Sequence, residues 1–255
     1  TYEAPYRPMF PLSSYALAAD RHMTQFGTTR DQLADVAVAA RAWARKNPEA
    51  FIRDPLTRED VIASRLVSDP LRVRDCCLVT DGGGALVMRR AETAKDHPKP
   101  PVYLLGGGEG TTHRDISEMA DLTATGAAQS GASAMGMAGV KPADIDVVQL
   151  YDAFTINVIL FLEDLGFCKK GEGGAFVENG GIAPGGHLPV NTNGGGLSCV
   201  HPGMYGIFTL VEAVRQLRGE AGDRQIAGAE LALAHGNGGV LSSQVTNILG
   251  TEATL

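Results

Sequence analysis

Basic residues are scarce in this chain of 255 residues. Lysine and arginine together number 22, against 29 aspartate and glutamate residues, which gives a formal net charge of -7. Because phosphate binding depends on clustered basic side chains and no such cluster is visible, nucleic acid is not expected as the main partner. The sequence also lacks an apolar run of the roughly 20 residues that a membrane span needs. It has no recognisable signal peptide or lipidation motif, so we predict a cytoplasmic location by default.

Cysteine is also scarce, and its spacing argues against two common uses. The four cysteines are Cys76, Cys77, Cys168 and Cys199; they form no Cys-x-x-Cys pair and have no histidine pattern suited to zinc. We therefore predict reduced, structurally buried thiols and no metal site. The run Gly106-Gly-Gly-Glu-Gly110 lacks the spacing of a dinucleotide fingerprint, so a Rossmann-type cofactor site is not expected.

Apolar segments separated by glycine-rich breaks predict an α/β fold. Near the N-terminus we expect helices over residues 12–26 and 28–46, the second capped by Thr28 or Thr29, and a short helix over 57–64. Residues 77–88 read as a strand or hairpin. From residue 101 onward the predicted order is strand 101–108, small-residue helix 121–140, strand 147–150, helix 156–165, helix 200–218, strand 229–234 and strand 240–249, with a long glycine-rich loop over 166–189.

The glycine-rich stretch of residues 191–206 is the part of the sequence most suggestive of chemistry. Three consecutive glycines, Gly194 to Gly196, permit close approaches that side chains would block. Pro202 suits the first turn of a helix, which would place His201 and Tyr205 at a helix N-terminus, where developing negative charge is stabilised. A purely structural reading, a glycine-rich turn with a core histidine and a packed tyrosine, stays open on these residues alone.

Three polar clusters stand where an apolar segment gives way to glycine: Tyr151, His201 with Tyr205, and His235 with Asn237. A shared pocket explains the common setting better than three coincidences. Histidine and tyrosine transfer protons and stabilise oxyanions, so we predict acid/base chemistry, with Tyr151, His201, Tyr205 and His235 as the catalytic residues. The residues expected to contact the substrate are Asn193, Gly195, Gly196, Asn237 and Gly238.

Several of these motifs together resemble the thiolase superfamily. They are Tyr151-Asp-Ala-Phe154, Leu188-Pro-Val-Asn-Thr-Asn-Gly-Gly-Gly-Leu-Ser198, His201-Pro-Gly203 and His235-Gly-Asn-Gly-Gly239. The resemblance is strongest to the sterol-carrier or lipid-transfer-protein branch, and within it to the steroid side-chain-cleaving aldolases. It implies a layered α-β-α-β-α architecture that lacks most of the first thiolase half. Residues 1–75 resemble the mainly helical loop domain, 76–98 the end of the first half with a linker, and 99–255 the C-terminal half.

Departures from the thiolase pattern bear on the expected reaction. The resemblance places Tyr151 where thiolases have an asparagine or histidine, and His235 where they have the cysteine of a Cys-x-Gly motif. His201, a member of the thioester oxyanion hole in the family, is kept. These exchanges weaken the case for thiolysis but suit retro-aldol cleavage of a β-hydroxyacyl-CoA, with a steroid side-chain thioester as one candidate substrate. Coenzyme A then enters as part of the substrate, and no tightly bound cofactor is expected.

Two alternatives remain open at this stage. One is an acetyl-CoA acetyltransferase whose nucleophilic cysteine lies in an N-terminal segment that this chain, which starts at Thr1 and not at methionine, does not contain. The other is a non-catalytic acyl-CoA-binding subunit. The resemblance also implies a homodimer and a small acyl-CoA-binding partner protein with an OB fold and a zinc ribbon.

Overall fold

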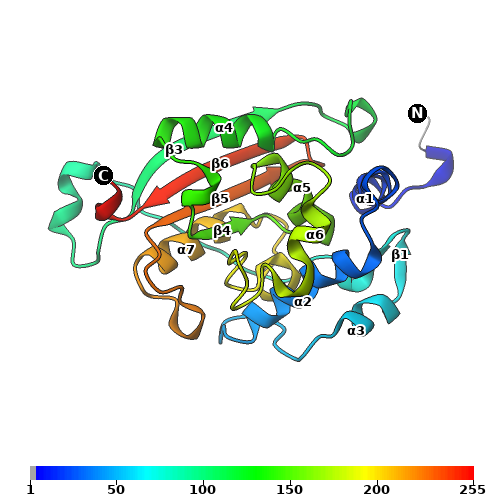
Figure 1. Ribbon diagram of the computed structural model, residues 1–255, viewed down its shortest axis with the longest axis horizontal. Helices are drawn as coiled ribbons and strands as arrows, with labels where there is room; N and C mark the ends of the chain where they lie inside the picture. Colours follow the sequence, from blue (N-terminus) through cyan, green and yellow to red (C-terminus); the bar gives the residue numbers. More distant parts are fainter. Residues whose placement is uncertain (1–3) are drawn as a thin grey trace.

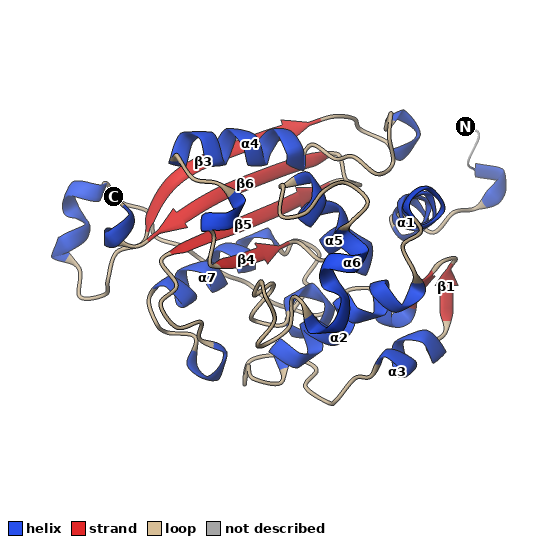
Figure 2. Ribbon diagram, in the orientation of Figure 1, coloured by secondary structure: helices blue, strands red, loops and turns tan. Residues whose placement is uncertain are grey.

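A four-stranded mixed sheet lies at the centre of the fold (Figures 1 and 2). The computed structural model describes residues 4–255. The strand order is β3 (Tyr103–Thr111), β6 (Ser243–Gly250), β5 (Leu231–Gly238) and β4 (Val147–Leu150). The pairs β3–β6 and β6–β5 are antiparallel, whereas β5–β4 is parallel. The parallel pair brings the C-terminal end of β4 beside the middle of β5.

Helices cover both faces of this sheet. On one face lie α4 (Ala127–Ala138) and α5 (Thr155–Asp164): Ser130 of α4 contacts Thr246, and the ring of Phe161 on α5 lies 4.6 Å from that of His235. On the other face α7 (Gly206–Leu217) packs its Ala213 against the alanines of β5. The predicted α/β class and the order of elements from residue 101 onward are therefore confirmed, as one α-β-α unit.

The close packing of α4 on β3 depends on glycine. Strand β3 continues to Thr111, beyond the end predicted at residue 108, so that the glycine run lies within the strand. A Cβ atom on Gly106 would stand 2.1 Å from the carbonyl oxygen of Ala134, and one on Gly108 would stand 2.2 Å from that of Ser130. The glycines facing the helix therefore permit contact between the two backbones.

The N-terminal part is helical, as predicted. It contains α1 (Leu12–Phe26), α2 (Arg30–Ala44) and α3 (Arg58–Ala63), followed by the two-stranded sheet of β1 (Leu66–Ser68) and β2 (Leu71–Arg72). Thr29 and Thr57 cap α2 and α3, each in a reciprocal capping box. None of the helices within residues 4–255 is long and apolar enough to cross a membrane.

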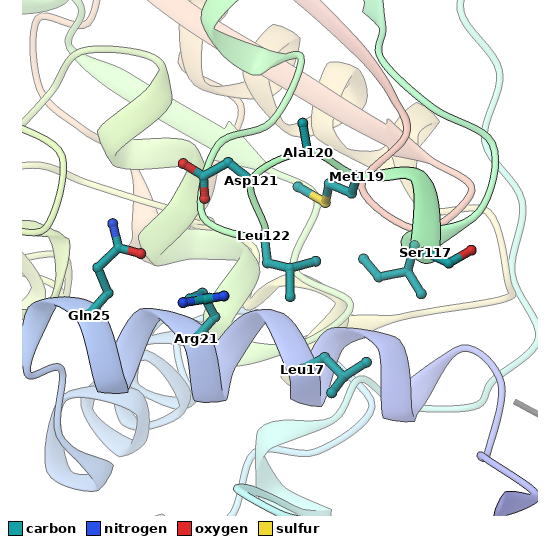
Figure 3. A pocket seen from close by; sticks show the side chains of 9 residues that line it. Leu17, Arg21, Gln25, Ser117, Met119, Ala120, Asp121 and Leu122 are labelled. Atoms are coloured by element: carbon teal, nitrogen blue, oxygen red, sulfur yellow. The ribbon is translucent and has the colours of Figure 1, made fainter. Parts of the chain in front are cut away.

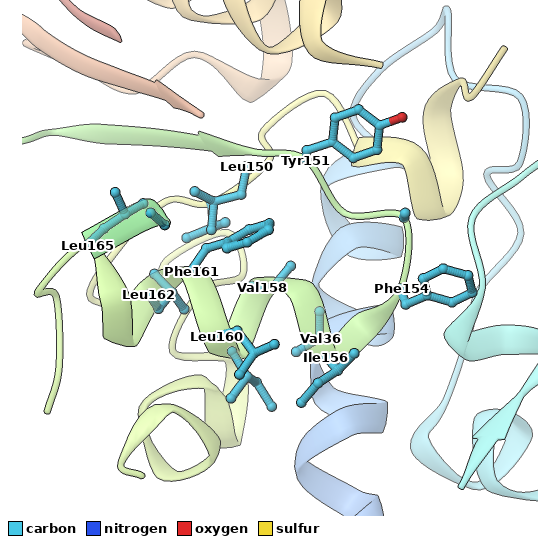
Figure 4. Packing of buried hydrophobic residues seen from close by; sticks show 14 of the residues in the cluster. Val36, Leu150, Tyr151, Phe154, Ile156, Val158, Leu160, Phe161, Leu162 and Leu165 are labelled. Carbon is cyan, nitrogen blue, oxygen red and sulfur yellow. The ribbon is translucent and has the colours of Figure 1, made fainter. Parts of the chain in front are cut away.

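The main hydrophobic core lies between these helices and the sheet. Nearly all of α5 is buried, and its apolar side chains pack between α2 and the sheet (Figure 4). Leu150, the last residue of β4, points into this core, whereas the ring of Tyr151 projects to the opposite side (Figure 4). The alternation of side chains at the end of one strand thus separates core from cavity.

Several other predicted elements differ from the structure. Residues 77–88, expected to form a strand or hairpin, form no strand, and Val79 and Val87 are almost fully exposed. Residues 77, 78 and 80 instead donate backbone hydrogen bonds to the carbonyl oxygens of Ala153, Gly196 and His201. The helix expected from residue 200 starts at Gly206. The strand expected to end at residue 234 continues to Gly238, because it pairs with β6 along its whole length. The glycine-rich loop 166–189 also contains a short helix, α6 (Gly173–Val177).

Candidate active site

A cavity of about 1000 Å3 lies between the sheet and the N-terminal end of α7. Its wall is contributed by segments far apart in the sequence: α1, residues 77–80, the end of β4, the loop 201–204, and the ends of β5 and β6. Most of the wall is apolar. The polar side chains on it include those of Tyr15, Tyr151, His201 and Asn237, so a ligand would meet few polar groups at defined places.

Tyr151 and His201 meet on the wall of this cavity. Their ring centroids are 5.5 Å apart and the rings meet edge to face. The hydroxyl of Tyr151 donates a hydrogen bond of 3.3 Å to the carbonyl oxygen of Gly203. The backbone N–H of His201 donates to Thr80 Oγ1, which fixes the loop, while the buried Nε2 of the ring has no partner among the described residues. The site therefore holds one unused imidazole nitrogen next to a phenol.

Burial sets the protonation of both groups. It raises the pKa of Tyr151, so the phenol keeps its proton near neutral pH. Burial lowers the pKa of His201, so its imidazole is neutral. A neutral imidazole carries one N–H donor and one acceptor nitrogen. The pair can therefore donate hydrogen bonds to an oxygen that gains negative charge.

Tyr205 lies behind this pair and does not line the cavity. Its ring is fully buried, 5.7 Å from Tyr151, and its hydroxyl donates to Asn193 Oδ1 at 3.0 Å. Burial raises the pKa of Tyr205 well above its ordinary value, so it stays a donor. Asn193 Oδ1 also accepts the backbone N–H of Gly195. Tyr205 and Asn193 thus hold the neighbouring turn and are not placed to touch a ligand.

The turn Gly195–Cys199 is wound around a buried carboxylate. Asp152 accepts the N–H of Gly196 at 2.6 Å and that of Leu197 at 3.3 Å. Gly195 has a φ of +65°, and a Cβ on it would stand 1.9 Å from Asp152 Oδ2. The close approach indicated by Gly195 and Gly196 is therefore made to Asp152, and both of their N–H groups are already used within the chain.

Asp152 is the residue of this region that the sequence reading did not single out. It is fully buried, and burial raises its pKa from 3.8 to about 7. From the other side, Arg41 of α2 donates to Ser198 Oγ at 2.9 Å and to the carbonyl oxygen of Asp54 at 3.0 Å. A carboxylate and a guanidinium thus fix the turn that precedes His201.

His235 does not share the cavity. Its side chain is fully buried on the opposite face of the sheet, against Phe161, and its two ring nitrogens contact Thr246 and Gln244, each at 2.9 Å. Ala234 and Gly236, its neighbours in β5, line the cavity instead. The structure therefore brings Tyr151, His201 and Asn237 to the same cavity, Asn237 at the end of the strand, and leaves His235 outside it.

Asn237 and Gly238 reach the cavity from the end of β5, together with a residue that no motif indicated. Tyr15 of α1 lines the cavity, accepts a hydrogen bond of 2.9 Å from Asn237 Nδ2 and donates one of 3.2 Å to the carbonyl oxygen of Gly239. Its only signal in the sequence is a place on the buried face of a helix, which it shares with ordinary core residues.

All four cysteines are free and un-ionised. Cys77 lines the cavity, but burial raises its pKa to about 12, and the pKa values of Cys76, Cys168 and Cys199 are raised to about the same value. The reduced state predicted from the sequence agrees with this, but the predicted burial holds fully for Cys199 alone, and the other three cysteines are half-buried. Because the thiolate is the nucleophilic form, none of these cysteines is activated.

A second cavity, of about 620 Å3, lies between α1 and the segment 116–122 (Figure 3). Leu17, Arg21 and Gln25, spaced by one helical turn, point towards it from α1. None of the site residues predicted from the sequence lines this cavity.

Comparisons with known proteins agree on one family of related proteins. The family of thiolase C-terminal domain-like proteins matches residues 108–251. The chain is 41% identical to the acetyl-CoA acetyltransferase of Methanothermobacter thermautotrophicus, over 97% of this chain and 65% of that protein. It is 38% identical to the steroid side-chain-cleaving aldolase of Thermomonospora curvata, over 82% of this chain and 54% of that protein.

A solved structure and a further relative belong to the same group of proteins. The Ltp2-ChsH2(DUF35) aldolase superposes with a TM-score of 0.91 at 34% sequence identity, over 99% of this chain and 66% of that one. The 17-hydroxy-3-oxo-4-pregnene-20-carboxyl-CoA lyase of Mycobacterium tuberculosis is 36% identical, over 95% of this chain and 64% of that protein. The chain thus spans between about half and two thirds of the length of these relatives.

Proposed function

The chain belongs to the thiolase superfamily, in its sterol-carrier-protein branch, and from this premise we propose that it carries the acid/base half of a carbon–carbon lyase site. The proposed reaction is retro-aldol cleavage of a β-hydroxyacyl-CoA to a carbonyl product and a shorter acyl-CoA. A steroid side-chain thioester is the proposed substrate class, supported by the aldolase and lyase relatives. We place this activity in the cytoplasm.

The reaction needs a proton transfer and a stabilised enolate. When the bond between the α- and β-carbons breaks, the β-hydroxyl loses its proton and its oxygen becomes a carbonyl, while the α-carbon and thioester become an enolate. Protonation of the α-carbon completes the reaction, so that one proton has moved from oxygen to carbon. Tyr151 is the proposed relay for this proton: the protonated phenol gives its own proton to the α-carbon while it takes the proton of the β-hydroxyl, so it ends the reaction protonated as it began. The unpartnered imidazole of His201 is the proposed donor to the enolate oxygen.

The observation that carries this proposal is the contact of Tyr151 with His201 on the cavity wall, beside a cysteine that is not ionised. Proton transfer and oxyanion stabilisation need no covalent acyl-enzyme, and Cys77 is poorly suited to form one. Tyr205, fully buried and bonded to Asn193, is assigned a supporting role in place of the proton transfer that its sequence context suggested.

Acetyl transfer is the second candidate, because the acetyl-CoA acetyltransferase relative is 41% identical. In that reading the nucleophilic cysteine lies outside residues 1–255. A third, non-catalytic alternative is a subunit that binds acyl-CoA. The benzoylsuccinyl-CoA thiolase subunit BbsB of Thauera aromatica, 36% identical, is by its name one subunit of a larger enzyme. We also propose a homodimer and a partner subunit, a small acyl-CoA-binding protein with an OB fold and a zinc ribbon; the solved aldolase complex supports a partner.

The test is product analysis of the full-length protein with β-hydroxyacyl-CoA thioesters. We expect a carbonyl product and a shorter acyl-CoA, and no acylated cysteine by mass spectrometry of the protein. Replacing Tyr151 with phenylalanine should lower kcat by about 100-fold or more, in the range for loss of a general acid or base. Tyr103→Phe, on the far edge of the sheet, is the matched control and should keep full activity.

Each alternative has a distinct result. An acylated cysteine formed from acetyl-CoA would favour acetyl transfer. Binding of acyl-CoA without turnover, in the protein purified with its partner, would favour the non-catalytic subunit. Cleavage that is unchanged in Tyr151→Phe would remove the proposed mechanism.

A further inference from the structure

A chain of hydrogen-bonded side chains connects the cavity wall to the opposite face of the sheet. Tyr15 and Asn237 line the cavity, whereas the other four members are fully buried. The links are Asn237 Nδ2 to Tyr15 Oη at 2.9 Å, Gln244 Nε2 to Asn237 Oδ1 at 2.9 Å, His235 Nε2 to Gln244 Oε1 at 2.9 Å, His235 Nδ1 to Thr246 Oγ1 at 2.9 Å, and Thr246 Oγ1 to Ser130 Oγ at 2.8 Å.

Strand pairing builds this chain. In the register of β5 with β6, His235 lies opposite Thr246 and Asn237 lies opposite Gln244. Residues two apart in a strand share a face, so the four side chains form a compact block at the end of the sheet. The link between His235 and Gln244 is the diagonal of that block. Since Ser130 belongs to α4, the block is also attached to the helix layer.

The hydrogen bonds of this side-chain network run in a single donor-to-acceptor direction. Gln244 donates its amide N–H to Asn237, so its amide oxygen is left to accept from His235 Nε2. His235 is neutral, because burial lowers its pKa to about 4, and it therefore carries one proton, on Nε2. Nδ1 is then an acceptor for the hydroxyl of Thr246. From Thr246 onward every member donates towards the cavity, and the last donor, the hydroxyl of Tyr15, bonds to the carbonyl oxygen of Gly239. The hydroxyl of Ser130 has two acceptors within reach, Thr246 Oγ1 at 2.8 Å and the carbonyl oxygen of Ala127 at 3.3 Å.

This direction decides whether Asn237 presents a hydrogen-bond donor or an acceptor to a ligand in the cavity. With its oxygen held by Gln244, the amide of Asn237 turns its NH2 group towards Tyr15. One amide hydrogen is used there, and the second has no partner among the described residues. A flipped amide would present an oxygen in its place, which would repel a thioester or enolate oxygen. The orientation of one amide thus changes the cavity wall from an acceptor to a donor.

We propose that His235 is a positioning residue, which acts through Gln244 to hold the amide of Asn237 so that its free N–H donates to an oxygen of the bound acyl-CoA. The proposal rests on the function proposed above and adds a donor on the wall contributed by β5. It gives His235 a role without contact with the substrate, and it makes Tyr15 the residue that fixes the other amide hydrogen. Buried chains of this kind favour one arrangement, since an unpaired member in the protein interior loses free energy.

The first test needs no substrate. Nitrogen-15 NMR of the full-length protein, with labelled histidine, reports which ring nitrogen carries the proton. We expect His235 in the Nε2–H form at pH 7. The Nδ1–H form, or an even mixture of both, would overturn the single direction on which the proposal depends, whatever the protein catalyses.

The second test measures turnover of a β-hydroxyacyl-CoA in the full-length protein. His235→Leu removes both links and should lower kcat by about 100-fold, the size expected for loss of one donor to an oxyanion. His235→Gln places an amide N–H near the position of Nε2 and should restore most of the loss. Gln244→Met breaks the same chain one link closer to the cavity, and serves if His235→Leu does not fold. Gln129→Met, on the exposed side of α4, is the matched control and should keep full kcat.

A double-mutant cycle separates positioning from general stability. Asn237→Asp removes the proposed donor, and His235→Leu combined with it should lower kcat no further than Asn237→Asp alone, because both act through one N–H. Losses that multiply, or a His235→Gln variant as inactive as His235→Leu, would overturn the proposal. If the unmodified protein turns over no acyl-CoA, the proposed function fails, and the same cycle measured on the Kd for acetyl-CoA decides whether the two residues are coupled.

Discussion

Replacing Asp152 with asparagine should change how the stability of the protein depends on pH. The carboxyl group is fully buried and accepts two backbone N–H groups of the turn Gly195–Cys199. Burial is the largest influence on its pKa and the hydrogen bonds from the turn oppose it; the result is a rise from 3.8 to about 7. In the unfolded chain the same carboxyl group has a pKa of about 4.

Proton binding decides whether the contribution of Asp152 to stability rises or falls with pH. A group whose pKa is higher in the folded state binds its proton more tightly there, so it favours folding at low pH. This contribution is fully present below pH 4 and is lost as the pH rises through about 7. The difference between 3.8 and about 7 corresponds to about 4 kcal/mol, at about 1.4 kcal/mol for each pH unit. Asparagine does not titrate, so Asp152→Asn lacks this dependence.

His235 makes the comparison with the variant necessary. Its pKa falls from 6.5 to about 4 on folding, so its contribution to stability rises over almost the same pH range and opposes that of Asp152. Because His235 is present in both proteins, it cancels in the difference between them.

The assay is urea unfolding of the full-length protein, followed by circular dichroism, at pH values from 4 to 8. The free energy of unfolding of the wild type, minus that of Asp152→Asn, should fall by about 4 kcal/mol across this range. Parallel curves for the two proteins would refute the reasoning, because they would mean that Asp152 keeps an ordinary pKa in its buried site.

Three further substitutions test the fold and the buried groups. Gly108→Ala should destabilise the protein by about 1–3 kcal/mol in urea unfolding, because the new methyl group meets the carbonyl oxygen of Ser130, whereas Gly107→Ala on the opposite face should be neutral or stabilising; equal effects would contradict the glycine contact. Arg41→Met should cost about 1–3 kcal/mol in the same assay, because both acceptors of the guanidinium lose their donor, and an unchanged midpoint would contradict this. The free energy of unfolding of the wild type minus that of His235→Gln should rise from pH 4 to 6.5, and a falling difference would contradict the lowered pKa.

Much of the fold could be predicted because its signals are local. The threonines before α2 and α3 are followed three residues later by their capping partners, and the strand over 147–150 is an apolar run with clear ends. The prediction failed where a partner far along the chain decides the structure. Residues 77–88 have the apolar pattern of a strand but no sheet neighbour among the described residues. Strand β5 continues past its apolar residues because β6 pairs with it to Gly238.

At the candidate active site, the sequence failed to predict the partners of residues that it had singled out. The sequence correctly indicated that Gly195 and Gly196 permit a close approach, but glycine shows that something approaches and not what it is; here it is the carboxylate of Asp152. Tyr15 could not be found, because it lies 136 positions before Tyr151 and only the packing of α1 brings it to the cavity.

The position of His235 shows why a motif at a strand end is ambiguous. A histidine that ends an apolar run points into the cavity if the strand stops there, but a strand that continues alternates its side chains, and His235 then shares a face with Thr246 and Phe161. Its neighbours Ala234 and Gly236 line the cavity in its place. The chemistry that the sequence assigned to His235 can then reach the cavity only through other side chains, and the chain of hydrogen bonds ending at Asn237 is the route that the strand register provides.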